Sequence, residues 1–104
     1  MDLDSDNPLA IEIRQEMAAA YFAACKKMVA SLEALQAFER AVGLATRDKA
    51  QIARRSGLLE EAAERVHFVV VQREAMNLSC FNEFFDDYEI PDEVRTRMGP
   101  KQSK

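Results

Sequence analysis

The sequence has little of what turns, disulfide frameworks and membrane spans require. Its 104 residues include no Trp, three Gly, three Pro and two Cys. So few glycines and prolines leave little material for turns, which favours long helices joined by few connections. Two cysteines without a CxxC spacing do not indicate a disulfide framework, and they fit free thiols in a reducing compartment.

A long uncharged run and a basic surface are also missing. The longest apolar stretch without a charge, residues 17–25, is far shorter than the ~20 residues that span a bilayer. The net charge of −4 argues against nucleic acid or an anionic membrane as the main partner. The first residues, MDLDSDNP, are acidic and lack the order of a secretory signal. We therefore expect a cytoplasmic protein with no nucleic-acid or membrane partner.

What the sequence does have is apolar periodicity over two long segments. The first segment, residues 8–42, has Asn7 at the cap position, Pro8 as first helical residue and Gly43 where a left-handed C-cap belongs. Its main apolar stripe has heptad-like spacing and consists of Ala18, Tyr21, Cys25, Met28, Leu32, Leu35 and Val42. Further apolar residues flank that stripe, so the apolar face is wider than a two-stranded coiled-coil seam.

The second segment, residues 46–77, contains a β-branched run at 66–71 that is also compatible with a buried strand. The flanking EEAAER and QREAM are strong helix formers without Pro or Gly, so we predict a helix capped by Thr46 or Asp48. Gly57 is its weak point, and we predict that the helix continues through it. The apolar positions of this helix recur at three and four residues: Ile52, Leu59, Ala62, Val66, Val69 and Met76.

Residues 79–98 form a C-terminal arm with three phenylalanines, and a short helix opens near Pro91. Residues 1–6 and 100–104 are expected to be disordered tails. The stretches AERVHFVVVQREAMNL and DYEIPDEVRTRMGP resemble the C-terminal half of a family of short bacterial helical proteins of unknown function. That resemblance implies a helical fold and a bacterial origin, and it brings no functional residues.

Glu64 and His67 are the candidate metal ligands, because Glu and His three residues apart occur in di-iron helical bundles. A hairpin turning near residue 44 pairs residues whose numbers add to about 89. Glu64 then lies opposite Cys25, far from any carboxylate of the first helix, so only a second chain could complete a site. A Cys25–His67 dyad or soft metal site is also conceivable, but a histidine at a solvated helix edge and a cysteine in the core are the favoured interpretations. No catalytic residue and no cofactor is predicted, and we expect a protein that is not an enzyme.

The charges are distributed in a pattern that fits a hairpin. The same register places Lys26 and Lys27 at the level of Glu61 and Glu64. It places Arg54 and Arg55 at the level of Glu33 and Glu39, and we expect these charges to form ion pairs at the hairpin edge. The turn end of the chain is locally basic and residues 83–93 are locally acidic, which suggests either end-to-end association or simply a solvated surface.

The sequence therefore predicts a single all-α domain: a long antiparallel helical hairpin with a short C-terminal helical arm, dimerising into a four-helix bundle. The expected function is a small non-catalytic interaction module, such as a regulator, an adaptor or a chaperone-like protein. The alternatives are a metal-binding or ferroxidase-like bundle using Glu64 and His67 across a dimer, and a structural subunit of a larger assembly. The predicted interaction face consists of Tyr21, Phe22, Met28, Leu32, Leu35, Phe81, Phe84 and Phe85.

Overall fold

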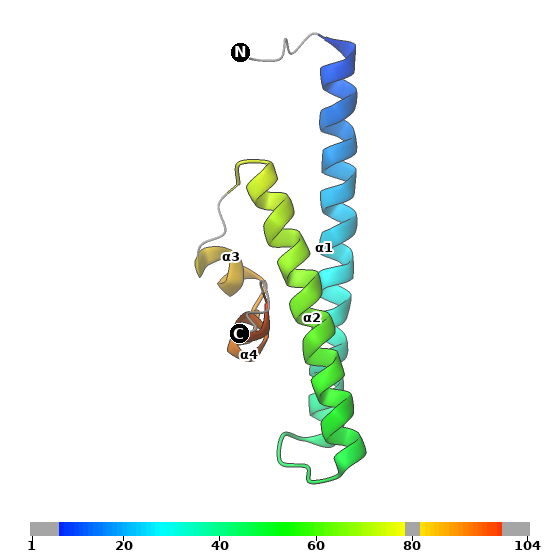
Figure 1. Cartoon of the computed structure of the whole chain (residues 1–104), viewed down its shortest axis with the longest axis vertical. Coiled ribbons are helices and arrows are strands. Elements are labelled where there is room, and N and C mark those ends of the chain that lie inside the picture. Colours follow the sequence, from blue (N-terminus) through cyan, green and yellow to red (C-terminus); the bar gives the residue numbers. More distant parts are fainter. Residues whose placement is uncertain (1–6, 79–81, 99–104) are drawn as a thin grey trace.

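Two long antiparallel helices form the body of the molecule, and two short helices pack on one side of it (Figure 1). A computed structural model describes residues 7–78 and 82–98. The helices in chain order are α1 (Pro8–Val42), α2 (Lys49–Ala75), α3 (Asn82–Asp87) and α4 (Asp92–Arg97). No strand occurs among these described residues, and the β-branched run lies inside α2. The prediction of an all-α hairpin with a short helical arm is confirmed.

Local hydrogen bonds define both ends of α1. The Asn7 Oδ1 atom accepts the Leu9 amide at 2.8 Å, and Pro8 follows as the first helical residue. At the other end, the Gly43 amide donates to the Glu39 carbonyl at 2.8 Å. Gly43 has a φ of 89°, a left-handed conformation that glycine adopts without steric cost. These two caps give α1 its 35 residues.

The connection between the long helices is longer than the sequence predicted. Asp48 caps α2 by accepting the amides of Ala50 at 2.8 Å and Gln51 at 3.3 Å. The Thr46 hydroxyl accepts the Asp48 amide at 3.2 Å and stays outside the helix. Because α2 begins at Lys49 rather than at residue 46, the pairing between the helices also shifts.

The observed register corrects the predicted one. Tyr21 is hydrogen-bonded to Arg73, and Glu39 to Arg55, so the paired residue numbers add to 94 rather than 89. The later start of α2 accounts for the direction of this shift. A slip of about five residues moves each partner by more than one helical turn, or roughly 7.5 Å along the axis.

Helix α2 is continuous through Gly57, as predicted, and it ends at Ala75 rather than at residue 77. Asn77 adopts a φ of 63°, and the Leu78 amide reaches back to the Arg73 carbonyl at 2.8 Å. A left-handed residue followed by such a long backward bond is the Schellman ending of a helix, for which Asn is the common alternative to Gly.

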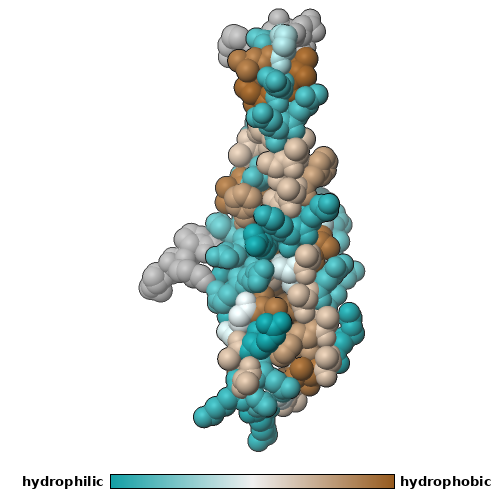
Figure 2. Space-filling model, turned by 90° about the vertical axis from the view of Figure 1, so that its right-hand side faces the viewer, coloured by the Kyte–Doolittle hydropathy of each residue, from teal (hydrophilic) through white to brown (hydrophobic). Residues whose placement is uncertain are grey.

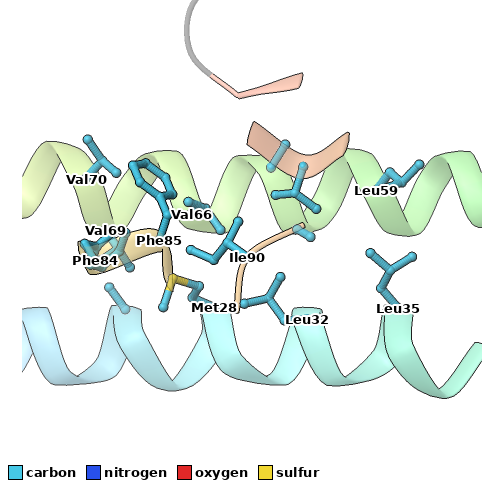
Figure 3. Packing of buried hydrophobic residues seen from close by; sticks show 14 residues of the cluster. Met28, Leu32, Leu35, Leu59, Val66, Val69, Val70, Phe84, Phe85 and Ile90 are labelled. Atoms are coloured by element: carbon cyan, nitrogen blue, oxygen red, sulfur yellow. The ribbon is translucent and has the colours of Figure 1, made fainter. Parts of the chain in front are cut away.

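The core lies between α1, α2 and the arm, at the level of α3 and α4 (Figure 3). Phe84 and Phe85 of α3, with Ile90 and Val94 further along, are each at most 8% exposed and belong to the same apolar cluster as the hairpin residues. Phe84 and Phe85 therefore pack on the hairpin of their own chain. Phe81 lies outside the described residues. The largest hairpin side chains in the cluster are Met28, Leu32, Leu35, Leu59, Val66, Val69 and Val70.

The two long helices differ in length, and α1 extends beyond the end of α2 (Figure 1). Met17 and Met76 line the same hollow, so the helical residues before Met17 have no α2 residue beside them. These nine residues, 8–16, extend by about 13 Å at 1.5 Å per residue. The molecule is accordingly elongated, with extents of 59 × 29 × 22 Å.

Candidate interaction surface

Arg55 joins three parts of the chain at the lower end of the hairpin. Its guanidinium is 2.6 Å from the Glu39 carboxylate of α1 and 2.5 Å from the Glu93 carboxylate of α4. A second guanidinium nitrogen reaches Glu93 at 3.1 Å, so the contact with the arm is bidentate. Bidentate arginine–carboxylate contacts are among the stronger and more directional polar interactions in proteins. We call this three-residue cluster the latch, because it ties α4 to both long helices.

The latch changes the acid–base properties of its members. Hydrogen bonds to Glu93 and Glu39 raise the pKa of Arg55. The hydrogen bond from Arg55 holds the pKa of the Glu93 carboxyl below its usual value. Both shifts favour the charged forms of Arg55 and Glu93.

Further contacts fix the arm above the latch. Arg97 of α4 donates to the Glu60 carboxylate of α2 at 2.8 Å. The Arg95 guanidinium lies 4.1 Å from the centre of the Phe85 ring, within the range of a cation–π interaction. Arg73 of α2 similarly lies 4.9 Å from the centre of the Phe84 ring. The arm thus combines an apolar underside with charged contacts at its margin, and it covers one side of the hairpin.

Three members of the predicted interaction face are core residues of the single chain. Met28, Leu32 and Leu35 are 0%, 7% and 1% exposed. They pack against α2 and the arm, which corrects the prediction that they present a surface to a second copy. The reason is that α2 lies along this stripe, and Phe84, Phe85 and Ile90 of the arm join the same apolar cluster. Phe84 and Phe85 are buried in the same core and do not present a surface to a second copy either.

Tyr21 and Phe22 differ although they are neighbours in sequence. Tyr21 is half-buried and accepts a hydrogen bond from Arg73 at 2.9 Å. Burial raises the pKa of the Tyr21 phenol, and the bond from Arg73 acts in the opposite direction. The Phe22 side chain is 64% exposed. Of the predicted face, Phe22 alone among the described members presents most of its side chain to solvent.

The opposite side of the hairpin has a groove that the arm does not reach. Three hollows of about 290, 370 and 210 Å³ lie along it, and they are lined by residues of α1 and α2 and by Met76, which follows α2. The first two share Phe68 and Gln72, and the second and third share Lys27 and Arg65, so together they form one continuous groove. We call it the back groove. Its α1 wall is mostly alanine, because Ala20, Ala23, Ala24, Ala30 and Ala34 line it.

The back groove continues into an exposed apolar end of the molecule. Phe68 and Val71 of α2 are 52% and 44% exposed, and Met17 at the end of the groove is 38% exposed. Beyond them, Leu9 and Ile13 of the α1 extension are 62% and 42% exposed. At this end of α1, Figure 2 shows strongly hydrophobic atoms on both sides of a hydrophilic strip, with paler hydrophobic atoms below them. Large exposed apolar residues that gather in this way mark interaction sites.

The candidate metal ligands do not come together with further ligands. Glu64 is exposed and His67 is half-buried. Among the described residues, no group of three or more His, Cys, Asp or Glu side chains could hold a metal ion. Cys25 instead lies by the Tyr21 and Tyr88 hydroxyls, while Cys80 lies outside the described residues.

Comparisons with known proteins bring no name for this surface. No family model, curated protein or solved structure matches the chain. Within residues 7–78 and 82–98, no helix has the length and apolar character needed to cross a bilayer. The surface therefore has to be interpreted from its own geometry.

Sequence reasoning missed two features of this surface. The contact of Arg55 with Glu93 was visible only as a basic turn end and an acidic arm, which were interpreted as either a solvated surface or a means of association between molecules. The alanine wall of the back groove was missed because alanine contributes little to an apolar pattern. Its signal was a second series of three- and four-residue spacings on α1, separate from the main stripe.

Proposed function

We propose that the chain is a small non-catalytic interaction module that binds another protein chain through the back groove and works as a homodimeric four-helix bundle. One observation carries this proposal. The arm covers one side of the hairpin, and the other side retains a continuous groove with Phe68 and Val71 about half exposed. A groove with small residues on one wall and large apolar residues on the other accepts an amphipathic helix, which is a common mode of recognition.

The electrostatics of the groove favour the same kind of partner. Lys27 and Arg65 line its middle, and Glu61 lies beside Arg65 at its lower end. A helix that packs apolar side chains into the ends and carries an acidic residue near the middle would complement it. Within this class, the roles of regulator, adaptor or chaperone-like protein all use such a surface.

The experiment compares two exposed phenylalanines on different faces. Tagged wild-type chain, a Phe68→Ser variant and a Phe22→Ser variant are used as baits in the native cell extract, and their own association is measured by light scattering. Phe68 lines the back groove and Phe22 does not. We expect Phe68→Ser to lose bound protein, a second copy of the chain included, and Phe22→Ser to retain it. Equal recovery by all three baits, or none, would contradict the proposal.

Two other functions are separable from this one. A metal-binding or ferroxidase-like bundle would need Glu64 and His67 of two chains, and stoichiometric iron or zinc in the purified protein would favour it. A structural subunit of a larger assembly would co-purify in fixed ratio with the other subunits rather than as a free dimer. No observed feature favours either function over the interaction module.

A further inference from the structure

The outer side of α1 has a row of residues that repeats every three or four positions from Leu9 to Ala34. The eight members of this row are Leu9, Ile13, Glu16, Ala20, Ala23, Lys27, Ala30 and Ala34. All of them are exposed in the single chain, and several of them form the α1 wall of the back groove. Alternating spacings of three and four define the contact row of a coiled-coil helix. We call this row the outer seam. Its occupant can be identified because the seam is complementary to itself when it is read in the opposite direction.

The complementarity begins with side-chain size. In an antiparallel pair of seams whose residue numbers add to 43, Leu9 faces Ala34 of the second copy, and Ile13 faces Ala30. The large exposed residues at one end thus meet the small residues at the other end. A hollow of about 210 Å³, lined by Ala30, Ala34 and Leu58, lies where Leu9 and Ile13 of the second copy would arrive. Each layer therefore pairs a projecting side chain with a recess.

The charges select the same register. Glu16 and Lys27 are the only charged residues of the seam, and they face each other when the numbers add to 43. Neither has an ion-pair partner among the described residues of its own chain. Moving the register by one heptad places Glu16 opposite Ala34 or Ala20, and both charges then lose their partner. At the flank, Glu12 comes near Glu33 of the second copy, but both are exposed, so their repulsion is screened.

The centre of the seam allows close approach. Ala20 faces Ala23 of the second copy on both sides of the two-fold axis, so no bulky side chain separates the helices there. The seam residues alternate between the a and d positions of a heptad. In every layer an a residue of one copy then faces a d residue of the other, as antiparallel coiled coils require. A two-fold axis makes all of these contacts occur twice, which is the property of an isologous dimer.

The available area is sufficient for a stable dimer. Residues 9–34 span about 38 Å of helix, and a helix about 10–12 Å wide then offers roughly 400 Å² along this length. The α2 rim of the groove, from Leu58 to Ala75, adds a second and shorter strip of about 26 Å. The total approaches the roughly 800 Å² per partner that a standard-size interface buries.

We propose that the partner in the back groove is a second copy of this chain, bound through antiparallel outer seams with Glu16 of each copy facing Lys27 of the other. This inference rests on the proposed function, since it identifies the occupant of the same groove. It differs from the dimer that the sequence predicted, because the contact row lies on the side of α1 away from the main apolar stripe.

The test exchanges the two charges. Glu16→Lys places a lysine opposite Lys27, and Lys27→Glu places a glutamate opposite Glu16, so each variant alone has two repulsive layers. We expect the dissociation constant of each, measured by sedimentation equilibrium on the full chain, to rise about tenfold or more, because two layers change sign together. An equimolar mixture of the two variants should form a heterodimer with nearly wild-type affinity, because both layers are then attractive. Lys26→Glu, the same change one residue outside the seam, serves as the control.

A second, uncharged pair of variants tests the packing. Ile13 and Ile11 are 42% and 40% exposed, but only Ile13 belongs to the seam. Ile13→Ser should weaken the dimer about tenfold or more, whereas Ile11→Ser should leave its dissociation constant within about twofold of wild type. Because both changes are at exposed positions, the melting temperature of the monomer should be equal for the two.

The outcomes separate this inference from the proposed function. Weakening by both charge exchanges, with recovery in the mixture, supports the antiparallel seam. A dimer that is indifferent to Glu16→Lys and Ile13→Ser overturns the seam, while the interaction module stands. A wild-type chain that stays monomeric at all concentrations overturns the second copy as partner. Capture of a different protein that depends on Phe68 would then preserve binding through the back groove and contradict the homodimeric bundle.

Discussion

Replacing Arg55 by methionine should loosen the arm while leaving the two long helices in place. Methionine keeps the length and the apolar stem of the side chain and removes the guanidinium that joins Glu39 to Glu93. The Arg55, Glu39 and Glu93 side chains are 19%, 26% and 56% exposed, so water screens both ion pairs. Exposed pairs contribute about 0.2–1 kcal/mol each, and bidentate geometry places these toward the upper end. We therefore expect the free energy of unfolding to fall by about 1–2 kcal/mol.

Urea denaturation measures this loss. For a chain of this size the slope is about 2 kcal/mol per molar urea, so the midpoint should fall by roughly 0.5–1 M. The matched control is Arg54→Met, which removes the same charge from the exposed neighbouring position. A double-mutant cycle with Glu93→Gln then isolates the contact with the arm from the contact with α1.

The difference between wild type and Arg55→Met should also depend on pH. Arg55 lowers the pKa of Glu93 in the folded chain, relative to an ordinary value of 4.5. A lowered carboxyl pKa stabilises the fold above the unfolded value, and this contribution is lost as the pH falls through the folded value. The gap in urea midpoint should therefore be full at neutral pH and shrink in acid below 4.5. If Arg55→Met matches Arg54→Met at neutral pH, or if the gap is unchanged in acid, the reasoning about the latch is refuted.

Further predictions concern two glycines and His67. Gly57→Ala should stabilise the chain by up to about 1 kcal/mol, because a Cβ there meets no atom within 4 Å and alanine is the better helix former. Gly43→Ala should instead destabilise it, because Gly43 holds a φ of 89°, and the two midpoints in urea should move in opposite directions. His67→Gln should change the free energy of unfolding by less than about 1 kcal/mol, and elemental analysis should find no stoichiometric metal in either protein. One iron or zinc per dimer that is lost in His67→Gln would contradict this and favour the ferroxidase-like alternative.

The helices themselves could be predicted because their signals are local. Asn7, Pro8 and Gly43 specify the ends of α1 through caps that involve only neighbouring residues. The long flanks of good helix formers overrode the β-branched run of α2 in the same way. The Asn77 ending was equally local, but asparagine is a weaker stop signal than glycine and it was not recognised.

The register and the surface could not be predicted, because several residues could fill the same structural role. The sequence does not show which cap residue starts α2 or which row of α1 is buried. Thr46 and Asp48 were both acceptable caps, and the choice of Asp48 moved every pairing between the helices. The wide apolar face of α1 likewise contained two rows, and the packing of α2 together with the arm decides which one is buried. Once Phe84 and Phe85 cover the row through Met28, the remaining row is the alanine-rich seam.

Because these two rows are separate, a last prediction is that a change in the arm lowers the stability of the chain without weakening association through the seam. Val94 of α4 is fully buried in the core cluster, on the arm side of the hairpin. Val94→Ala removes buried methyl groups and leaves a small cavity, which should lower the free energy of unfolding by about 2 kcal/mol. The outer seam contains no residue of the arm, so the dissociation constant of the dimer, measured well below the melting temperature, should stay within about twofold of wild type. A parallel loss of stability and of association would mean that the arm itself forms the interface, and the back groove would then not be the site where two copies meet.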